Sequence, residues 1–322
     1  QTPQGFEIID GRAVPTSWIE IIFNPSFPYR LIHMSIAAFL ATALFVAGSA
    51  AWHLLQGTDN KPIRKMFSMG LWMLFFVAPL QAIVGDLHGL NTLQYQPAKL
   101  AAMEGHWENK PGEGVPLTLF GWPDMEREET RFAVEIPRLG SLILTHSWDG
   151  QIPGLKDFPP EDRPNSTVVF WSFRIMVGLG LLMILMGIWG AVLRWRKRLW
   201  YDRLFQRFAL LMAPSGLIAI LAGWFTTEIG RQPWTVYGVF RTADSVSNHS
   251  AEQLGFTLIL FIVVYAAIFG NGIAYVFRLI QKGPQPFEGR HVEDGGVGQE
   301  RTPMRPLSAA KKSDRDDAKE QD

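Results

Sequence analysis

Five long stretches of the chain carry no Asp, Glu, Lys or Arg, and polar segments separate them. These stretches are residues 31–55, 66–85, 175–193, 208–227 and 253–277. Because the hydrocarbon core of a bilayer is about 30 Å thick, a helix of about 20 apolar residues can span it. The pattern therefore predicts an all-α protein, a polytopic membrane helical bundle with five spans. We expect the third span to begin earlier than its uncharged stretch, near Val168, and to include Arg174.

The basic residues of the polar segments gather between alternate spans. Segments 56–65 and 194–207 are rich in Lys and Arg, as is the segment after the fifth span, whereas acidic residues outnumber basic ones in 86–166. Cytoplasmic loops carry the excess of Lys and Arg in membrane proteins. We therefore expect the basic segments to face the cytoplasm, and 86–166 and 228–252 to lie outside. The amino terminus is then outside and the carboxyl terminus inside.

The chain divides into five parts on this reading. Residues 1–30 lack the apolar core of a signal peptide and are expected to form an ordered outer segment. Two membrane spans follow in 31–85, an outer loop in 86–166 and three membrane spans in 167–282. Residues 283–322 are rich in Pro, Gly and charged residues, which predicts a disordered cytoplasmic tail.

The amino-acid composition excludes several kinds of functional site and partner. The chain has no cysteine, which excludes disulfides, thiolate metal sites, iron–sulfur clusters and covalently attached haem. Its 30 basic residues equal its 30 acidic residues, so there is no electrostatic reason to expect a nucleic-acid partner.

Polar residues inside spans are costly and are candidates for function. The predicted topology brings His33, Arg174, Met176 and Glu228 near the same outer leaflet. An imidazole and a thioether are a pair of axial ligands for a low-spin haem, and an arginine can offset a buried propionate. The residues alone leave other interpretations open, because His33 also suits an interfacial position and Met176 suits simple packing. Arg174 can also extend to the headgroups.

Two further groups of residues have both a structural and a functional interpretation. Gly230 after Glu228 is typical of a helix end, but the carboxylate beside Arg231, one turn after Trp224, suggests a cofactor or proton-transfer role. Residues 99–108 have helical spacing. Lys99 and Glu104 in this segment have two interpretations. They bind the polar head of a quinol, or they are polar residues of a solvated amphipathic helix.

Four stretches together resemble one known family. They read GFEIIDGRAVPTSWIEIIFNPSFPYRLIHM, GDLHGLNTLQYQPAKLAAMEGHWE, FRIMVGLG and GWFTTEIGRQPW. From its first residues to about Arg278 the chain resembles subunit I of cytochrome bd-type quinol oxidases, which oxidise quinol and reduce dioxygen to water. The short loop 86–166 is similar to the branch that includes cyanide-insensitive oxidases.

The resemblance implies roles for the haem-side residues. His33 and Met176 match the axial ligands of the low-spin haem b, and Arg174 matches the arginine that stabilises its reduced state. Glu228 matches a carboxylate ligand of iron at the high-spin haem pair, a haem b and a haem d. Trp224 matches a tryptophan that assists electron transfer between haems.

The resemblance also implies a substrate, partners and a location. Lys99 and Glu104 match the quinol-oxidation residues of the loop 86–166, called the Q-loop, and Arg231 belongs to the outer haem region. The substrate is then ubiquinol or menaquinol, and the membrane lipid surrounds the subunit. Subunit II and small single-span subunits are the expected partners. The expected location is the bacterial cytoplasmic (inner) membrane, where such oxidases serve aerobic respiration and generate a proton gradient.

The chain departs from the family at its start. It lacks the amino-terminal four-helix section, which in the family carries a histidine ligand of one high-spin haem and the glutamates of a proton path. We therefore expect the carboxy-terminal two-thirds of the subunit, with an oxygen-reducing centre that is incomplete in this chain. The alternatives are a haem-b electron-transfer subunit of a membrane dehydrogenase, for which only His33 and His53 lie inside spans, a transporter, and an inactive fragment.

Overall fold

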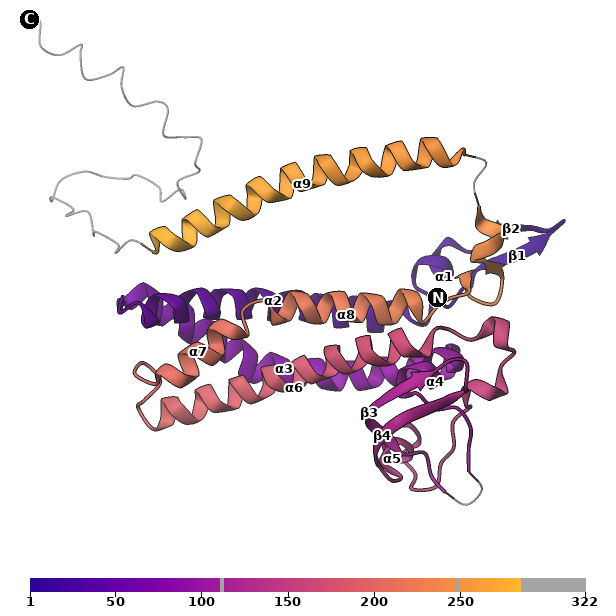
Figure 1. Cartoon of the computed structure of the whole chain (residues 1–322), viewed down its shortest axis with the longest axis horizontal. Helices are drawn as coiled ribbons and strands as arrows, with labels where there is room; N and C mark the ends of the chain where they lie inside the picture. The colour runs from indigo at the N-terminus through magenta and orange to yellow at the C-terminus, as the bar shows by residue number, and fades with distance from the viewer. Residues whose placement is uncertain (111–112, 247–248, 285–322) are drawn as a thin grey trace, which may run out of the picture. The chain divides into compact units, whose positions relative to one another are not determined.

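The computed structural model describes residues 1–110, 113–246 and 249–284. Among the described residues, five helical segments are long and apolar enough to cross a membrane. They are α2 (Phe27–Leu55), α3 (Lys61–Tyr95), α6 (Ser166–Trp195), the pair α7 (Arg203–Leu211) and α8 (Ser215–Ile229), and α9 (Ala251–Lys282). The chain is thus a multi-pass membrane protein with a helical bundle (Figure 1). The predicted tail falls almost wholly on residues 285–322, outside the described residues.

Four helices form a bundle in which each packs on two others. Helix α2 packs on α3 and α8, and α6 packs on the same two helices. Helices α2 and α6 are therefore at diagonal corners, as are α3 and α8, and Figure 1 shows α2 beside α8 and α3 beside α6. Short turns join the helices at one end, which we call the turn end. The opposite end carries the amino terminus and the long loops, and we call it the loop end.

Small residues let the helices approach closely. A Cβ on Gly216 of α8 would lie 2.4 Å from the Cα of Ala41 on α2. A Cβ on Gly187 of α6 would lie 2.8 Å from the Cα of Phe75 on α3. Since lipid tails are as apolar as the helices themselves, close packing of small residues is a main source of association between spans.

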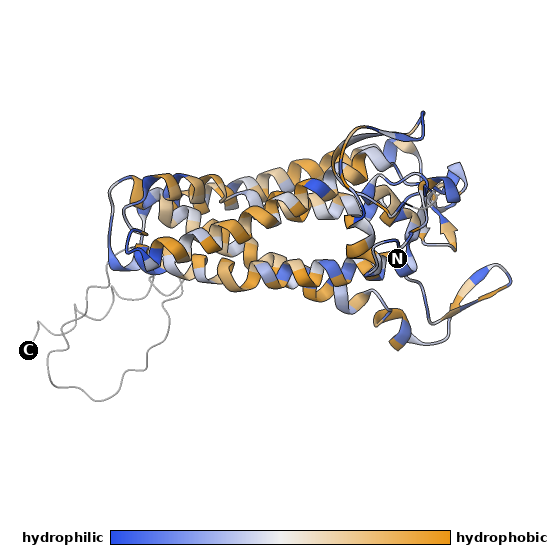
Figure 2. Cartoon of the chain, turned by 90° about the horizontal axis from the view of Figure 1, so that it is seen from below, coloured by the Kyte–Doolittle hydropathy of each residue, from blue (hydrophilic) through white to orange (hydrophobic). Residues whose placement is uncertain are grey.

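Apolar side chains also cover the outside of the bundle. Phe76 of α3 is 65% exposed and Leu181 of α6 is 60% exposed. Figure 2 shows hydrophobic residues along the helices, while hydrophilic residues gather at both ends of the bundle. Such a surface is stable in lipid, where the backbone is satisfied within each helix.

Capping residues define where several helices begin. The side chain of Asn60 accepts a hydrogen bond from Ile63 N at the start of α3, and Asn165 accepts one from Val168 N at the start of α6. Both helices extend beyond the uncharged stretches of the sequence. The predicted fourth span is divided, because α7 ends at Leu211 and α8 begins just after Pro214.

The loop end contains short elements. The sequence predicted no strands, yet three antiparallel hairpins occur here. They are β1 (Phe6–Ile9) with β2 (Arg12–Pro15), β3 (Leu117–Asp124) with β4 (Glu129–Ile136), and β5 (Trp234–Val236) with β6 (Phe240–Arg241). The short helices are α1 (Trp18–Ile22), α4 (Pro97–Glu104), α5 (Leu139–Thr145), η1 (Leu155–Asp157), η2 (Pro160–Asp162) and η3 (Thr242–Ser245).

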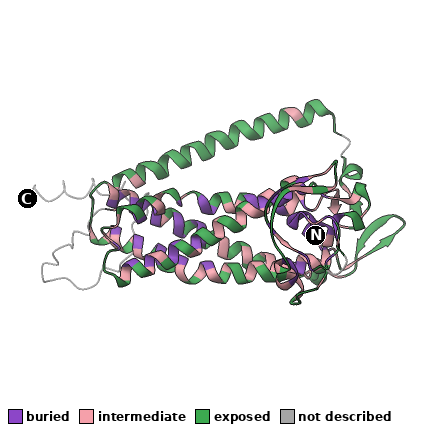
Figure 3. Cartoon of the chain, turned by 60° about the horizontal axis from the view of Figure 1, so that its bottom comes forward, coloured by how far each residue is buried: buried purple, intermediate pink, exposed green. Residues whose placement is uncertain are grey.

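Helix α9 differs from the other spans in its burial. Within the described residues it contains no buried side chain, and Figure 3 shows it exposed along most of its length. At the turn end, His53 Nε2 lies 2.8 Å from the carbonyl oxygen of Ile280. His53 therefore contacts the last turn of α9, which explains why this histidine is buried.

Candidate functional site

His33 and Met176 lie on the two diagonal helices of the bundle. His33 is on α2, less than two turns after its start, and Met176 is on α6. Both side chains are half-buried. Because α2 and α6 both begin at the loop end and run toward the turn end, and both residues lie in the first half of their helix, the two side chains belong to the same end of the bundle.

A glycine faces each of these two side chains. A Cβ on Gly85 of α3 would lie 3.4 Å from His33 Cε1, and a Cβ on Gly223 of α8 would lie 2.8 Å from Met176 Sδ. Any larger residue at Gly223 would press directly on the sulfur. The other two helices of the bundle, α3 and α8, thus carry no side chain at the positions that face the imidazole and the thioether.

The buried core is interrupted at this level. In the described part of the chain, α2 has no buried residue in 27–39, α3 none in 79–90 and α6 none in 173–182. The same helices carry fully buried side chains nearer the turn end, among them Leu44 and Leu74. Figure 3 shows this change along the bundle.

These features fit a haem. His33 Nδ1 is buried and has no hydrogen-bond partner among the described residues. A lone-pair nitrogen and a thioether sulfur are the donor set of a six-coordinate, low-spin haem iron. The helices around these two residues carry no buried side chains at this level, and glycines face both proposed ligands.

Arg174 connects α6 to the Q-loop. Its Nη2 lies 2.9 Å from Glu104 Oε2 and donates to the carbonyl oxygen of Thr118 at 2.6 Å. It also donates to the carbonyl oxygen of Met103, and its guanidinium lies 4.1 Å from the ring centroid of Phe170. The structure therefore brings together two of the predicted site residues, Arg174 and Glu104.

Lys99 lies on α4, on a different side of the site from Glu104. It is 4% exposed, and its ammonium donates to the side-chain oxygen of Gln1. A Cβ on Gly230 would lie 2.8 Å from Lys99 Cγ, so the lysine stem packs against the end of α8. Burial, together with the nearby charges of Arg30 and Arg231, lowers the pKa of Lys99 well below its usual value.

The end of α8 holds a second ion pair. Arg231 Nη2 donates to Glu228 Oε2, and Arg231 Nη1 donates to the carbonyl oxygen of Thr235. Arg231 Nε is buried without a partner among the described residues. Trp224, one turn before Glu228, is 58% exposed. More than half of the Trp224 side chain therefore lies on the surface of the described part of the chain.

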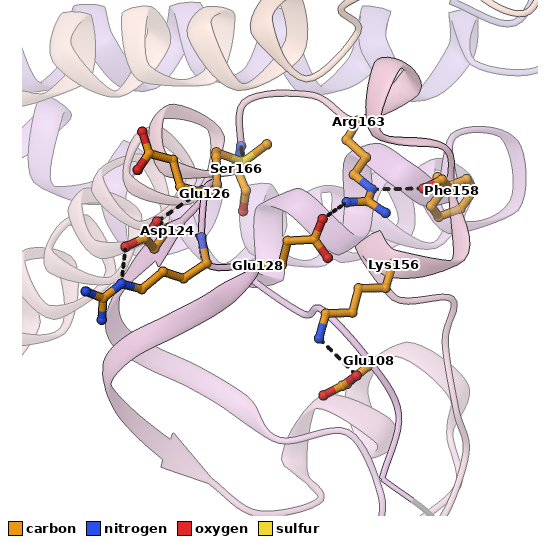
Figure 4. Close-up of polar contacts among 10 residues, drawn as sticks. Glu108, Asp124, Glu126, Glu128, Lys156, Phe158, Arg163 and Ser166 are labelled. Atoms are coloured by element: carbon orange, nitrogen blue, oxygen red, sulfur yellow. Dashed lines mark hydrogen bonds and ion pairs between the residues drawn. The ribbon is translucent and has the colours of Figure 1, made fainter.

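Further contacts join distant parts of the Q-loop to one another and to the start of α6. Figure 4 shows Lys156 Nζ paired with Glu108 at 3.0 Å and Arg163 Nη1 paired with Glu128 at 2.6 Å. Ser166 Oγ donates to the carbonyl oxygen of Ala102 at 3.1 Å. Residues 98–104 of α4 are all buried in this region.

Sequence reasoning missed four residues that contact the predicted ligands. They are Gln81, Gly85, His88 and Gly223. The His88 ring centroid lies 5.7 Å from that of His33. Gln81, Gly85 and His88 follow one another at intervals of four and three residues, which places them on one face of α3. This spacing is the feature of the sequence from which these three residues could have been predicted to share a face.

Comparisons with known proteins identify a family for the chain. The family model described as "Cytochrome bd terminal oxidase subunit I" matches residues 1–284. Cytochrome bd-II ubiquinol oxidase subunit 1 of Escherichia coli (strain K12) is 29% identical, with 89% of this chain and 69% of the relative covered. Cytochrome bd ubiquinol oxidase subunit 1 of Bacillus subtilis (strain 168) is 33% identical, with 88% and 63% covered.

A solved structure of a bd oxidase is also similar to this chain. The bd oxidase from Geobacillus thermodenitrificans matches with a TM-score of 0.78 at 31% identity, covering 88% of this chain and 64% of that chain. The chain thus spans about two-thirds of the length of these relatives, between 63% and 69%.

Proposed function

The chain belongs to the cytochrome bd terminal oxidase subunit I family, and we propose that it carries the low-spin haem site and the quinol-oxidation site of a quinol:dioxygen oxidoreductase. One observation carries the proposal. His33 and Met176 lie on diagonal helices at the level where the buried core is interrupted, and a glycine faces each side chain.

His33 and Met176 are the proposed axial ligands of a haem b. A haem held in this way supplies a one-electron carrier, and methionine ligation raises its reduction potential. Gly85 and Gly223 keep the space beside the two ligands free. Arg174, two residues before Met176, places a positive charge near the site and so favours the reduced state.

Lys99 and Glu104 are the proposed quinol-oxidation residues. Because burial lowers its pKa, Lys99 is able to accept a proton or a hydrogen bond from a quinol hydroxyl. Glu104 accepts hydrogen bonds and is held in place by Arg174. Both residues lie at the loop end, so protons taken from quinol leave on that side. With the amino terminus outside and the carboxyl terminus inside, release on that side contributes to a proton gradient.

The end of α8 is the proposed region of the high-spin haems. Glu228 is the proposed carboxylate ligand of iron, and Arg231 orients it through their ion pair. Trp224 is the proposed aromatic group for electron transfer. We propose that a high-spin haem b and a haem d, and the reduction of dioxygen to water, also involve the part of the relatives that this chain does not cover.

The proposal extends to location and partners. We place the protein in the bacterial cytoplasmic (inner) membrane, in a complex with subunit II and small single-span subunits. The relatives include enzymes named for ubiquinol and for menaquinol, so both quinols are candidate substrates. A cytochrome b of a dehydrogenase would need a second haem site, and His53 is instead engaged with Ile280.

Single-turnover kinetics test the quinol site. In the full oxidase, mixing with quinol under anaerobic conditions and following the low-spin haem band measures the rate of electron entry. We expect Glu104→Gln to slow this rate by at least about tenfold, since a positioned acid–base group contributes about 10²–10⁴-fold. Glu108→Gln, which changes an exposed carboxylate in the same loop, is the matched control. Equal rates in both variants would contradict the proposal.

A further inference from the structure

Gln81 of α3 is the polar side chain in closest contact with His33. Its Nε2 lies 3.2 Å from His33 Nε2 and donates to the carbonyl oxygen of His33 at 3.1 Å. Its Oε1 is buried and has no partner among the described residues. One glutamine therefore approaches both the backbone and the ring of the proposed iron ligand, and it retains an unused acceptor.

The chemistry of imidazole makes this contact significant. A neutral imidazole has one nitrogen with a lone pair and one with a hydrogen. When iron takes the lone pair, the N–H is on the other nitrogen, and the acceptor of that N–H fixes the tautomer and the ring orientation. Rotation of the Gln81 amide exchanges its donor NH₂ for its acceptor oxygen, so the side chain gives up its bond to the His33 carbonyl oxygen and accepts the ring N–H in its place.

An acceptor on the imidazole N–H also changes the iron. The hydrogen bond makes the imidazole a more basic ligand. A more basic ligand stabilises the oxidised iron, and hydrogen bonding around the ligand is one of the means by which a protein sets a haem potential. Loss of the acceptor should then raise the potential, and a stronger acceptor should lower it.

We propose that Gln81 is the positioning residue of His33, and that its side-chain oxygen accepts the imidazole N–H and lowers the reduction potential of the low-spin haem. This inference rests on the proposed function, because it assumes that His33 ligates the haem iron. A packing role is the competing explanation, since Gln81 also joins α3 to α2 through the carbonyl oxygen of His33. If Gln81 accepts the imidazole N–H, removing the acceptor and strengthening it shift the reduction potential in opposite directions. A packing role predicts no such opposite shifts.

Redox titration of the low-spin band in the full oxidase tests the inference. Gln81→Leu removes the acceptor, so its midpoint potential should shift above that of the wild type. Gln81→Glu keeps the size and supplies a stronger acceptor, so its potential should shift below it. Asn91→Leu is the matched control: Asn91 is a buried amide on the same helix that bonds Ser26 and Pro25, and its loss should leave the potential unchanged.

Shifts of the same sign in both Gln81 variants, or wild-type potentials in both, would overturn the inference. If Gln81→Leu does not retain haem, Gln81→Glu decides alone, and a potential at or above that of the wild type overturns it. His33→Ala separates this result from the proposed function. A low-spin band that persists in His33→Ala refutes the ligand assignment, whereas loss of the band there with unshifted Gln81 variants refutes only the role of Gln81.

Discussion

Arg174 Nη2 lies 2.9 Å from Glu104 Oε2, and both side chains are largely buried, at 13% and 8% exposure. This ion pair joins two parts of the site that are far apart in sequence. Arg174 is two residues from the proposed ligand Met176, and Glu104 is a proposed quinol residue of the Q-loop. One guanidinium therefore connects the proposed quinol site to the proposed haem site.

Removing the arginine should loosen the Q-loop. Arg174→Leu leaves the Glu104 carboxylate buried without its partner, which costs about 3–5 kcal/mol in comparable buried pairs. Hydrogen exchange of the α4 amides measures the local opening free energy. Lys156→Gln breaks the more exposed pair with Glu108 in the same loop and should cost less than about 1 kcal/mol. Equal costs in the two variants would show that the buried pair has no special role.

Enlarging Gly223 should disturb the methionine ligand. The Cβ of Gly223→Ala would lie 2.8 Å from Met176 Sδ, so the sulfur must move. We expect the low-spin band to weaken or its potential to shift. Gly270→Ala on α9 is the control, because a Cβ there has no neighbour within 4 Å. An unchanged low-spin band and potential in Gly223→Ala would show that Met176 is not held where it could act as a ligand.

His106 should make the Q-loop sensitive to pH. Burial lowers its pKa from 6.5, although a hydrogen bond with Asn109 and nearby carboxylates oppose the shift. Between the folded pKa and about 6.5 the unfolded loop binds more protons, so loop stability rises with pH across that window and falls as pH decreases.

Proteolysis of the Q-loop at about pH 5 and about pH 7.5 measures this dependence. His106→Gln should reduce the difference in cleavage rate between the two pH values, while His146→Gln, a change at an exposed histidine, should leave it unchanged. A pH difference that persists fully in His106→Gln would assign it to other groups.

The crossing of α6 and α3 should not tolerate a side chain at Gly187. A Cβ there would lie 2.8 Å from both Phe75 Cα and Phe75 N, which are backbone atoms and cannot rotate away. Overpacking of this kind typically costs about 1–3 kcal/mol. Gly187→Ala should lower the thermal unfolding temperature of the detergent-solubilised protein, and Gly272→Ala on α9, which has open space, should not.

Much of the bundle follows from the sequence. The uncharged stretches predicted each span because a charge is costly in the middle of the lipid bilayer. The ends of the spans were less predictable. Asn60 and Asn165 extend α3 and α6 through capping bonds, and Pro214 divides the fourth span. These are local effects that hydropathy does not report.

The partners of the site residues were not predictable from the sequence. From the sequence, the expected partner of Arg174 was a haem propionate or a lipid headgroup. In the structure it pairs with Glu104, which is 70 residues away in the chain. His53, one of the two histidines inside the predicted spans, contacts Ile280 near the end of the last span. Such contacts depend on how loops fold over the bundle, and no periodic pattern encodes them. The hairpin β3–β4, which brings Thr118 to Arg174, was likewise not predicted.

The most direct test of the central claim is the reduced-minus-oxidised visible spectrum of membranes that contain the full oxidase. The account predicts that His33→Ala and Met176→Leu each abolish the low-spin haem b band while the subunit still inserts, as shown by immunoblotting. His146→Ala and Met69→Leu, at exposed positions, should retain it. A low-spin band of wild-type intensity in either His33→Ala or Met176→Leu would contradict the account.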